Sequence, residues 1–178
     1  MDKNYYISKA LEQAKIAYKK NEVPIGAIVV KDDKIISTGY NKREKKQNAL
    51  MHAEIIAINK ACKKLKSWRL DDCDIYITLE PCLMCYGAIL NARIKNCYFG
   101  AFDKSGGSIS SNQELLNKSI LNHKINVEGG ILKDECSQIL STFFEEKRKN
   151  LLFYVAIFLF YCRMIDKFYM LFYNKQNV

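Results

Sequence analysis

Two short motifs contain the residues best suited to carry chemistry, His52-Ala53-Glu54 and Pro81-Cys82-Leu83-Met84-Cys85. Histidine nitrogens and cysteine thiolates are zinc ligands, and a site with three such ligands leaves a fourth position for water. Glu54 follows closely after His52, so its carboxylate could lie beside the metal without binding it. A carboxylate in that place can serve as general base and general acid in a hydrolysis. The two motifs together therefore predict a catalytic metal site.

Other cysteines could in principle close the site as a fourth ligand: Cys62, Cys73, Cys97 and Cys136. None of them has a partner at ligand spacing, and each lies in an apolar or strand-like context. We interpret them as small buried hydrophobes. The opening residues MDKNYYISKA have neither the basic nor the apolar region of a secretory signal. We therefore expect reduced cysteines and a cytoplasmic protein.

Both motifs should lie where helices begin. Hydrophobic periodicity and turn residues predict helices over 3–20, 52–65, 81–92 and 133–149, and strands over 25–30, 35–40, 74–79, 96–101 and 125–128. The polar residues 41–50 and the glycine- and serine-rich residues 103–111 are predicted to be loops. The N-terminus of a helix stabilises negative charge and so favours the thiolates that bind zinc. Alternating strands and helices predict a layered α/β domain whose first two strands form an antiparallel hairpin.

The chain has 178 residues, a length typical of one domain, and 28 basic against 19 acidic residues, a net charge of +9. The positive charge weakly favours a polyanionic partner. Lysine, asparagine, isoleucine and tyrosine are abundant, as expected from AT-rich codon usage, so single lysine runs carry little information.

Residues 151–178 differ from the rest, with nine Phe or Tyr among them against 12 aromatic residues in the first 150. Their apolar run ends at Arg163 and is too short for a typical membrane span. Three interpretations stay open: a buried or dimer-covering helix, an interfacial membrane segment within 151–173, or an extension without selected structure. The sequence thus predicts a domain over 1–150 and an extension of unknown role over 151–178.

The motifs resemble those of the cytidine-deaminase-like superfamily and, within it, the bacterial tRNA-specific adenosine deaminases. Histidine-x-glutamate followed by Pro-Cys-x-x-Cys is the signature of zinc nucleobase deaminases. The resemblance covers about residues 3–149 and departs from the family at Met51, Tyr86 and the tail. Further matching segments are Asn21–Ala27, Gly39–Asn41, Thr78–Cys82, Gly87–Ala88, Phe99–Ala101, Asp103, Gly107–Ser108, Asn122–His123 and Glu128–Leu132.

The resemblance implies a three-layer α/β/α sandwich with a mixed, mostly five-stranded central sheet. It implies hydrolytic conversion of adenosine to inosine at the tRNA wobble position by a homodimer with one Zn²⁺ per subunit. The zinc ligands would be His52, Cys82 and Cys85, and Glu54 would move protons between the attacking water, a ring nitrogen and the departing amine. Substrate-binding positions would be Asn41, Ile25, Ala53, Leu83 and Asp103.

Contacts to the tRNA anticodon loop are predicted with less support. By resemblance His123 could touch RNA, although a loop histidine is more often solvated or capping. Lys147 and Arg148 could bind phosphates or form a solvated helix end, and Phe144 could stack on a base or belong to the core.

Three other functions stay open: deamination of a free base, nucleoside or nucleotide of the cytosine, guanine or dCMP type; a zinc-stabilised RNA-binding module without catalysis; and membrane attachment through residues 151–173.

Overall fold

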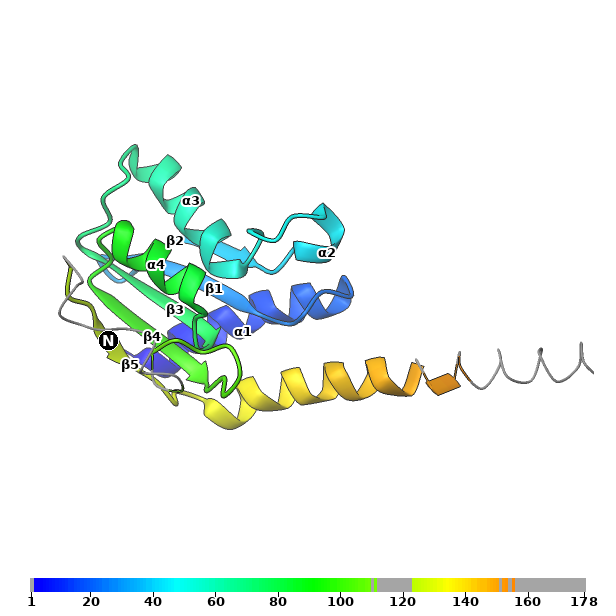
Figure 1. Ribbon diagram of the computed structural model, residues 1–178. Coiled ribbons are helices and arrows are strands. Elements are labelled where there is room, and N and C mark those ends of the chain that lie inside the picture. The colour runs from blue at the N-terminus through cyan, green and yellow to red at the C-terminus, as the bar shows by residue number, and fades with distance from the viewer. Residues whose placement is uncertain (1, 110, 112–122, 151, 154, 156–178) are drawn as a thin grey trace, which may run out of the picture. The chain divides into compact units, whose positions relative to one another are not determined.

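The computed structural model describes residues 2–109, 111, 123–150, 152–153 and 155 (Figure 1). The chain forms two compact units, Met1–Leu140 and Ser141–Val178. The first unit contains the sheet and both sequence motifs. Its elements are α1 (Lys3–Lys19), β1 (Gly26–Lys31), β2 (Lys34–Tyr40), α2 (Arg43–Lys46), α3 (Ala53–Leu65), β3 (Cys73–Leu79), α4 (Leu83–Asn91), β4 (Asn96–Ala101) and β5 (Asn126–Glu128).

One predicted loop contains a helical turn. Residues 41–50 include α2, a single turn that the polar composition of this segment did not indicate. A further helix covers 133–150, in agreement with the helix predicted over 133–149. The glycine- and serine-rich segment after β4 is a loop where it is described, as expected.

The sheet is mixed, with strand order β2-β1-β3-β4-β5. β1 pairs antiparallel with both β2 and β3, whereas β3–β4 and β4–β5 are parallel. Because β3 and β4 run the same way, the segments that follow them emerge at the same edge of the sheet. One of these segments carries Cys82 and Cys85, and the other is the loop that begins near Asp103.

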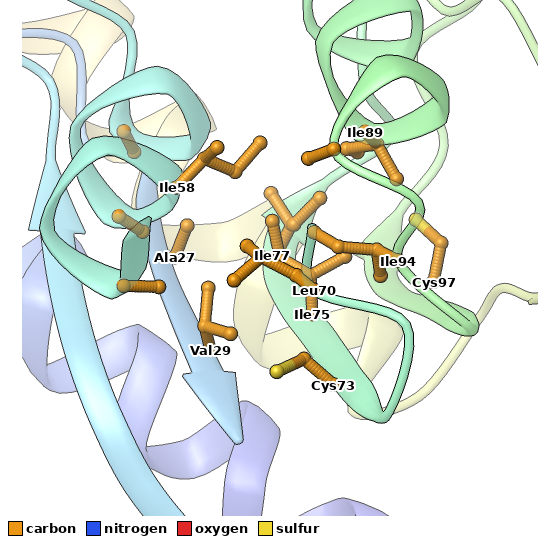
Figure 2. Packing of buried hydrophobic residues seen from close by; sticks show 14 of the residues in the cluster. Ala27, Val29, Ile58, Leu70, Cys73, Ile75, Ile77, Ile89, Ile94 and Cys97 are labelled. Atoms are coloured by element: carbon orange, nitrogen blue, oxygen red, sulfur yellow. The ribbon is translucent and has the colours of Figure 1, made fainter. Parts of the chain in front are cut away.

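Helices cover both faces of the sheet, which confirms the predicted three-layer α/β/α sandwich. Alternate residues of β1 face opposite ways: Ala27 and Val29 pack toward α3 and α4, and Ile28 and Val30 pack toward α1. Figure 2 shows the first cluster, in which Ile58 of α3 and Ile89 of α4 approach Ile75 and Ile77 of β3. The second cluster contains Tyr6, Ile7, Ala10, Leu11, Ile28, Val30, Tyr76, Ala101, Ile131 and Cys136.

Small residues let the strands approach the helices closely. A Cβ on Gly39 of β2 would lie 2.1 Å from the carbonyl oxygen of Ala53 and 2.8 Å from the nitrogen of Ala57. The start of α3 is therefore in direct contact with the end of β2. This contact fixes the start of α3, and with it His52, relative to the sheet.

No helix in the part of the chain that the structure describes has both the length and the apolar character needed to cross a bilayer. Within the extension predicted over 151–178, only residues 152, 153 and 155 are described, and they are helical. The roles considered for 151–173 otherwise concern residues outside the described part.

We predict that Gly39→Ala lowers the free energy of unfolding by about 1–3 kcal/mol, since the added methyl group forces α3 away from β2. Gly87→Ala is the matched control, because no atom lies within 4 Å of a Cβ added there. In the interior of α4 this control is expected to raise stability by up to about 1 kcal/mol. Urea denaturation measures both, and equal midpoints for the Gly39→Ala variant and the parent protein would contradict the close approach.

Candidate metal and catalytic site

His52 and Cys82 occupy equivalent positions, each as the N-cap of the helix that follows. Both have extended backbones, with φ −74° and ψ 154° at His52 and φ −72° and ψ 168° at Cys82. Neither side chain makes the capping hydrogen bond that an N-cap residue commonly makes. Their polar atoms face each other instead, because α3 and α4 begin at the same side of the domain.

Three ligand atoms converge at this point. Nδ1 of His52 lies 3.8 Å from Sγ of Cys82 and 3.5 Å from Sγ of Cys85, and all three atoms lie within 4.8 Å of one another. Tetrahedral zinc, with bonds of about 2.3 Å to sulfur and about 2.1 Å to nitrogen, separates neighbouring ligand atoms by about 3.6–3.8 Å. The donor atoms and their spacing therefore fit a metal ion. Among the His, Cys, Asp and Glu side chains of the described residues, His52, Cys82 and Cys85 form the group whose ligand atoms are close enough to share a metal ion.

Local hydrogen bonds favour a thiolate at Cys82, at the start of α4. The pKa of Cys82 is lowered to about 4, first by a hydrogen bond from the Cys85 thiol and then by one from His52. The pKa of Cys85 is raised, because its proton is held by Cys82 and its side chain is buried. The pKa of His52 is raised mainly by its hydrogen bond with Cys82. One negative charge is thus already favoured among the ligand atoms.

Glu54 lies in the first turn of α3 and is only 4% exposed. Its Oε2 atom is buried and has no hydrogen-bond partner among the described residues. Burial is also the main reason why the pKa of this carboxyl is raised. A buried carboxylate oxygen without a partner costs free energy of folding, so the position of Glu54 beside the His52, Cys82 and Cys85 group makes it a candidate for a chemical role.

Asn41 is buried where β2 ends. Its backbone N–H donates to the carbonyl oxygen of Ile25 at 3.1 Å, and its Oδ1 accepts a hydrogen bond from the N–H of Arg43 at 3.3 Å. The next residue, Lys42, donates its N–H to the carbonyl oxygen of Met51, which precedes His52. These bonds join the predicted base-binding residues Asn41 and Ile25 to the segment that carries the metal ligand.

Two buried glutamates that sequence reasoning missed hold the loops around the site. Glu22, 1% exposed, accepts hydrogen bonds from the backbone N–H groups of Glu44 and Lys45 and so supports α2. Glu80, 2% exposed, accepts from the backbone N–H groups of Asp103, Ile109 and Ser111. The signal in the sequence was the position of each glutamate just before a proline segment at the end of a regular element.

Asp103 belongs to the loop that Glu80 holds. Its Oδ1 accepts hydrogen bonds from the N–H of Ser105, the hydroxyl of Ser105 and the N–H of Gly106. The same loop pairs with Cys82 through Gly107. Asp103 thus shapes a turn beside the ligand-bearing segment, and its predicted contact with substrate stays a prediction.

The other predicted wall residues lie near the ligands in the chain and differ in exposure. Ala53 is fully buried and follows His52, whereas Leu83 is 51% exposed at the start of α4. Ile25 is half-buried and packs against the cluster between the sheet and α3. Leu83 is therefore the wall residue most open to a partner molecule.

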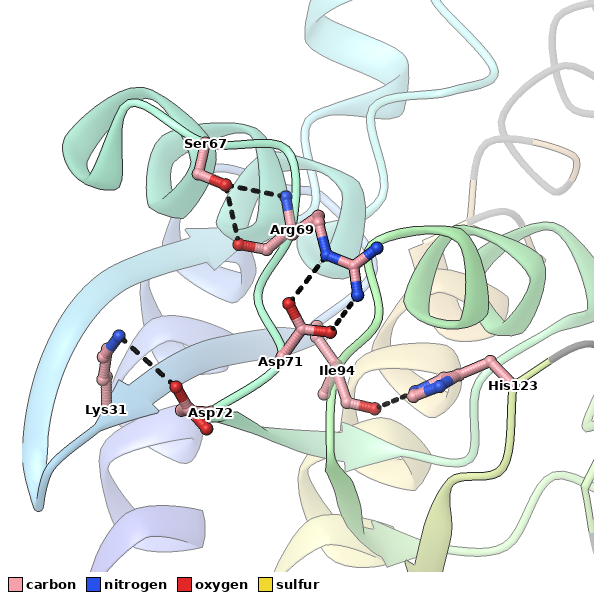
Figure 3. A network of polar contacts seen from close by, with 7 residues as sticks. All are labelled: Lys31, Ser67, Arg69, Asp71, Asp72, Ile94 and His123. Carbon is pink, nitrogen blue, oxygen red and sulfur yellow. Dashed lines mark hydrogen bonds and ion pairs between the residues drawn. The ribbon is translucent and has the colours of Figure 1, made fainter.

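The predicted RNA contacts are divided between the two units, with His123 in the first and Phe144, Lys147 and Arg148 in the second. His123 donates a hydrogen bond from Nε2 to the carbonyl oxygen of Ile94 at 2.9 Å (Figure 3). This bond ties His123, the first residue of the described range 123–150, to the turn before β4. In the second unit, Phe144 is 43% exposed, and Lys147 lies 5.4 Å from the ring centroid of Phe143.

The remaining described cysteines behave as predicted. Cys73, Cys97 and Cys136 are fully buried in the hydrophobic clusters, and Cys62, which lies in α3, is half-buried. Burial raises the pKa of Cys73 to about 11 and that of Cys136 to about 12, so these thiols stay protonated.

Comparisons with known proteins agree with this geometry. Residues 1–148 match the MafB19-like deaminase family. A protein of Bacillus subtilis named tRNA-specific adenosine deaminase is 44% identical over 145 residues, which are 82% of this chain and 90% of that protein. The chain belongs to the family of tRNA-specific adenosine deaminases.

Solved structures support the same assignment. A structure from a study of A-to-I editing by tRNA:A34 deaminases at the wobble position of transfer RNA is 38% identical, with a TM-score of 0.73. It matches 76% of this chain and 99% of its own. A guanine deaminase from Bacillus subtilis is also 38% identical, with a TM-score of 0.55 over 57% of this chain and 66% of its own. The deaminase fold is shared with enzymes whose names give different substrates.

We predict that Cys82→Ser reduces bound zinc from about one ion per chain to below about a tenth of that, because a ligand is lost. Cys62→Ser is the matched control, since Cys62 lies outside the ligand group. Elemental analysis of purified protein measures both. Equal zinc content in the two variants would show that the metal binds elsewhere.

Proposed function

We propose that this protein hydrolyses adenosine to inosine at the wobble position of tRNA. The observation that carries the proposal is the ligand triad of His52, Cys82 and Cys85 beside the buried carboxylate of Glu54. Relatives that match most of the chain are named for this activity, including one from Rickettsia bellii that is 46% identical over 142 residues. The tRNA substrate is inferred from these relatives.

The proposed cofactor is zinc, held by Nδ1 of His52 and the sulfurs of Cys82 and Cys85. Two sulfurs and one imidazole nitrogen favour zinc over the harder cations, which prefer oxygen. When bound in such a site, zinc supplies the Lewis acidity that makes water a nucleophile near neutral pH.

Glu54 moves the protons of the reaction. Its Oε2 accepts a proton from the attacking water and delivers it to a ring nitrogen of the adenine. As the water oxygen bonds to carbon 6, that carbon becomes tetrahedral. Oε2 then takes the second proton from the new hydroxyl group and passes it to the amine, and the C–N bond breaks to release ammonia and leave the carbonyl of inosine. The unpartnered state of Oε2 among the described residues supports this role, because a carboxylate already saturated with hydrogen bonds would be a poor base.

Asn41 orients the base. Oδ1 is engaged by the N–H of Arg43, whereas the side-chain amide nitrogen makes no hydrogen bond to a described residue, so it can donate to a ring nitrogen of the purine. Ile25 and Leu83 would form the apolar walls, and the backbone of Ala53 and the turn at Asp103 would border the base. The wobble base reaches this site only when it is unstacked, as in an anticodon loop.

Deamination of a free base is the second candidate, and the similarity to a guanine deaminase favours it. That match covers less of this chain than the matches to the tRNA enzymes. A zinc-stabilised RNA-binding module is less favoured, because it has no use for a buried carboxylate beside the ligands with an oxygen that has no partner among the described residues.

The proposal extends to assembly and location. The homodimer with one zinc ion per subunit comes from the sequence resemblance. The cytoplasmic location, and the division into a deaminase domain over residues 1–150 and an extension, come from the cysteine usage and the composition of the sequence. His123, Phe144, Lys147 and Arg148 stay candidates for RNA contacts within that proposal.

We predict that the purified protein forms inosine in tRNA and does not turn over free adenosine, cytosine, guanine or dCMP at a comparable rate. The reason is that contacts to the rest of the tRNA supply binding energy that a free base lacks. Mass spectrometry of nuclease-digested tRNA and of the free compounds gives the answer. Turnover of free guanine with no inosine in tRNA would favour the second candidate.

We predict that Glu54→Gln lowers kcat by about 10²–10⁴-fold while zinc content and melting temperature stay close to those of the parent, since Gln keeps the shape and cannot carry the proton. Single-turnover deamination of tRNA, with zinc analysis of the same sample, measures both quantities. Undiminished activity in this variant would disprove the assigned role of Glu54.

A further inference from the structure

The ammonium groups of two lysines lie close to the side chain of Tyr40, the residue before Asn41. Nζ of Lys20 lies 4.7 Å from the ring centroid and donates a hydrogen bond to the Tyr40 hydroxyl, and Nζ of Lys42 lies 4.6 Å from the same centroid. Lys20 follows the end of α1, whereas Tyr40 and Lys42 lie at and just beyond the end of β2. The ring thus holds two ammonium groups from separate segments at one place, which we call the lysine clamp.

No described carboxylate neutralises the clamp. Neither Lys20 nor Lys42 forms an ion pair within the described part of the chain. The acidic groups nearby are engaged elsewhere, since Glu22 accepts two backbone hydrogen bonds from α2 and Glu44 pairs with Arg43. Two unneutralised ammonium groups repel each other, so an anion bound between or beside them would lower the electrostatic energy.

Three more lysines lie close to the clamp residues in the chain. Lys19 precedes Lys20, and Lys45 and Lys46 follow in α2, all of them exposed. The N–H groups of Glu44 and Lys45 in α2 are already bonded to Glu22, so the ammonium groups rather than this short helix would bind an anion. The charge is therefore concentrated on side chains that can reach a backbone phosphate.

The clamp is joined directly to the catalytic site. Gly39, just before Tyr40, contacts the start of α3 at Ala53. The backbone N–H of Lys42 donates to the carbonyl oxygen of Met51, next to the ligand His52. Asn41 lies between Tyr40 and Lys42 in the chain and is buried, whereas Tyr40 and Lys42 are half-buried and Lys20 is exposed.

We propose that Lys20 and Lys42, spaced by Tyr40, bind a phosphate of the RNA backbone next to the nucleotide whose base enters the site. The proposal rests on the proposed function, because it takes a tRNA anticodon loop as the occupant. Phosphate contacts position a nucleic acid without reading its sequence. The clamp would set the register of the loop so that one extruded base meets Asn41 and Glu54.

The test is binding of a fluorescein-labelled anticodon stem-loop RNA to the zinc-loaded protein, followed by anisotropy at increasing salt. We expect K20Q/K42Q to weaken binding by about tenfold at low salt and to lower the slope of log K against log salt by about one to two. At saturating RNA, kcat should also fall, by about two- to tenfold, because a loop bound out of register presents its base less often to Asn41 and Glu54. K63Q/K64Q is the matched control, since it removes the same charge from exposed residues at the far end of α3.

K20R/K42R keeps the charge and should restore both affinity and slope. An affinity of K20Q/K42Q equal to that of K63Q/K64Q overturns the proposal, as does a loss that the arginine variant does not restore. Failure of the proposed function would look different. In that case the unaltered protein would form no inosine in tRNA, yet loss of RNA binding in K20Q/K42Q alone would still support the clamp.

Discussion

The close approach of two helix starts is the constraint on which the site depends. One imidazole nitrogen and two sulfurs lie within 4.8 Å of one another only because α3 and α4 begin at the same side of the sheet. Gly39 permits this at α3, since any larger residue would push Ala53 away from β2. At α4, the parallel pairing of β3 and β4 brings the cysteine segment to the loop that Glu80 holds. The spacing of the three ligand atoms thus depends on how the helices pack on the sheet, so a substitution that moves α3 or α4 would also move these atoms.

Three buried glutamates differ in their hydrogen bonds: two hold backbone segments around the site, and the third lies at the site itself. Glu22, Glu54 and Glu80 are 1%, 4% and 2% exposed. Glu22 and Glu80 accept several backbone hydrogen bonds, which stabilise a carboxylate and fix the loops that donate them. Glu54 has an oxygen without a partner in the described residues. The same residue type therefore fixes two sides of the site through Glu22 and Glu80, and at its centre Glu54 keeps the unpartnered oxygen on which the proposed mechanism relies.

Hydrophobic periodicity and ligand spacing are local signals, and they allowed a layered α/β domain, the first hairpin, the His52-Cys82-Cys85 group and Glu54 to be predicted. The five-stranded sandwich came from the family resemblance, and the order of the strands was not predicted. The burial of Cys73, Cys97 and Cys136 followed from their apolar and strand-like contexts. α2 was missed, because the bonds that stabilise it come from Glu22, which lies far away in the sequence. The lysine clamp was also not predictable, since Lys20 and Lys42 meet only after β1 and β2 form their hairpin. Polar contacts between residues far apart in the sequence produce no repeating pattern from which they could be predicted.

The division between a buried site and an exposed basic rim follows from the chemistry proposed for the chain. One base offers few groups for recognition, and burial of Asn41 and Glu54 limits the site to that base. Binding energy for a large RNA must therefore come from outside the site, and it improves the rate when it holds the base in the reactive orientation. Lys42 is suited to this, since its ammonium group lies by the Tyr40 ring while its backbone N–H is bonded to the carbonyl oxygen of Met51, next to His52. Backbone contacts can hold the RNA in place through this residue without altering the groups that do the chemistry.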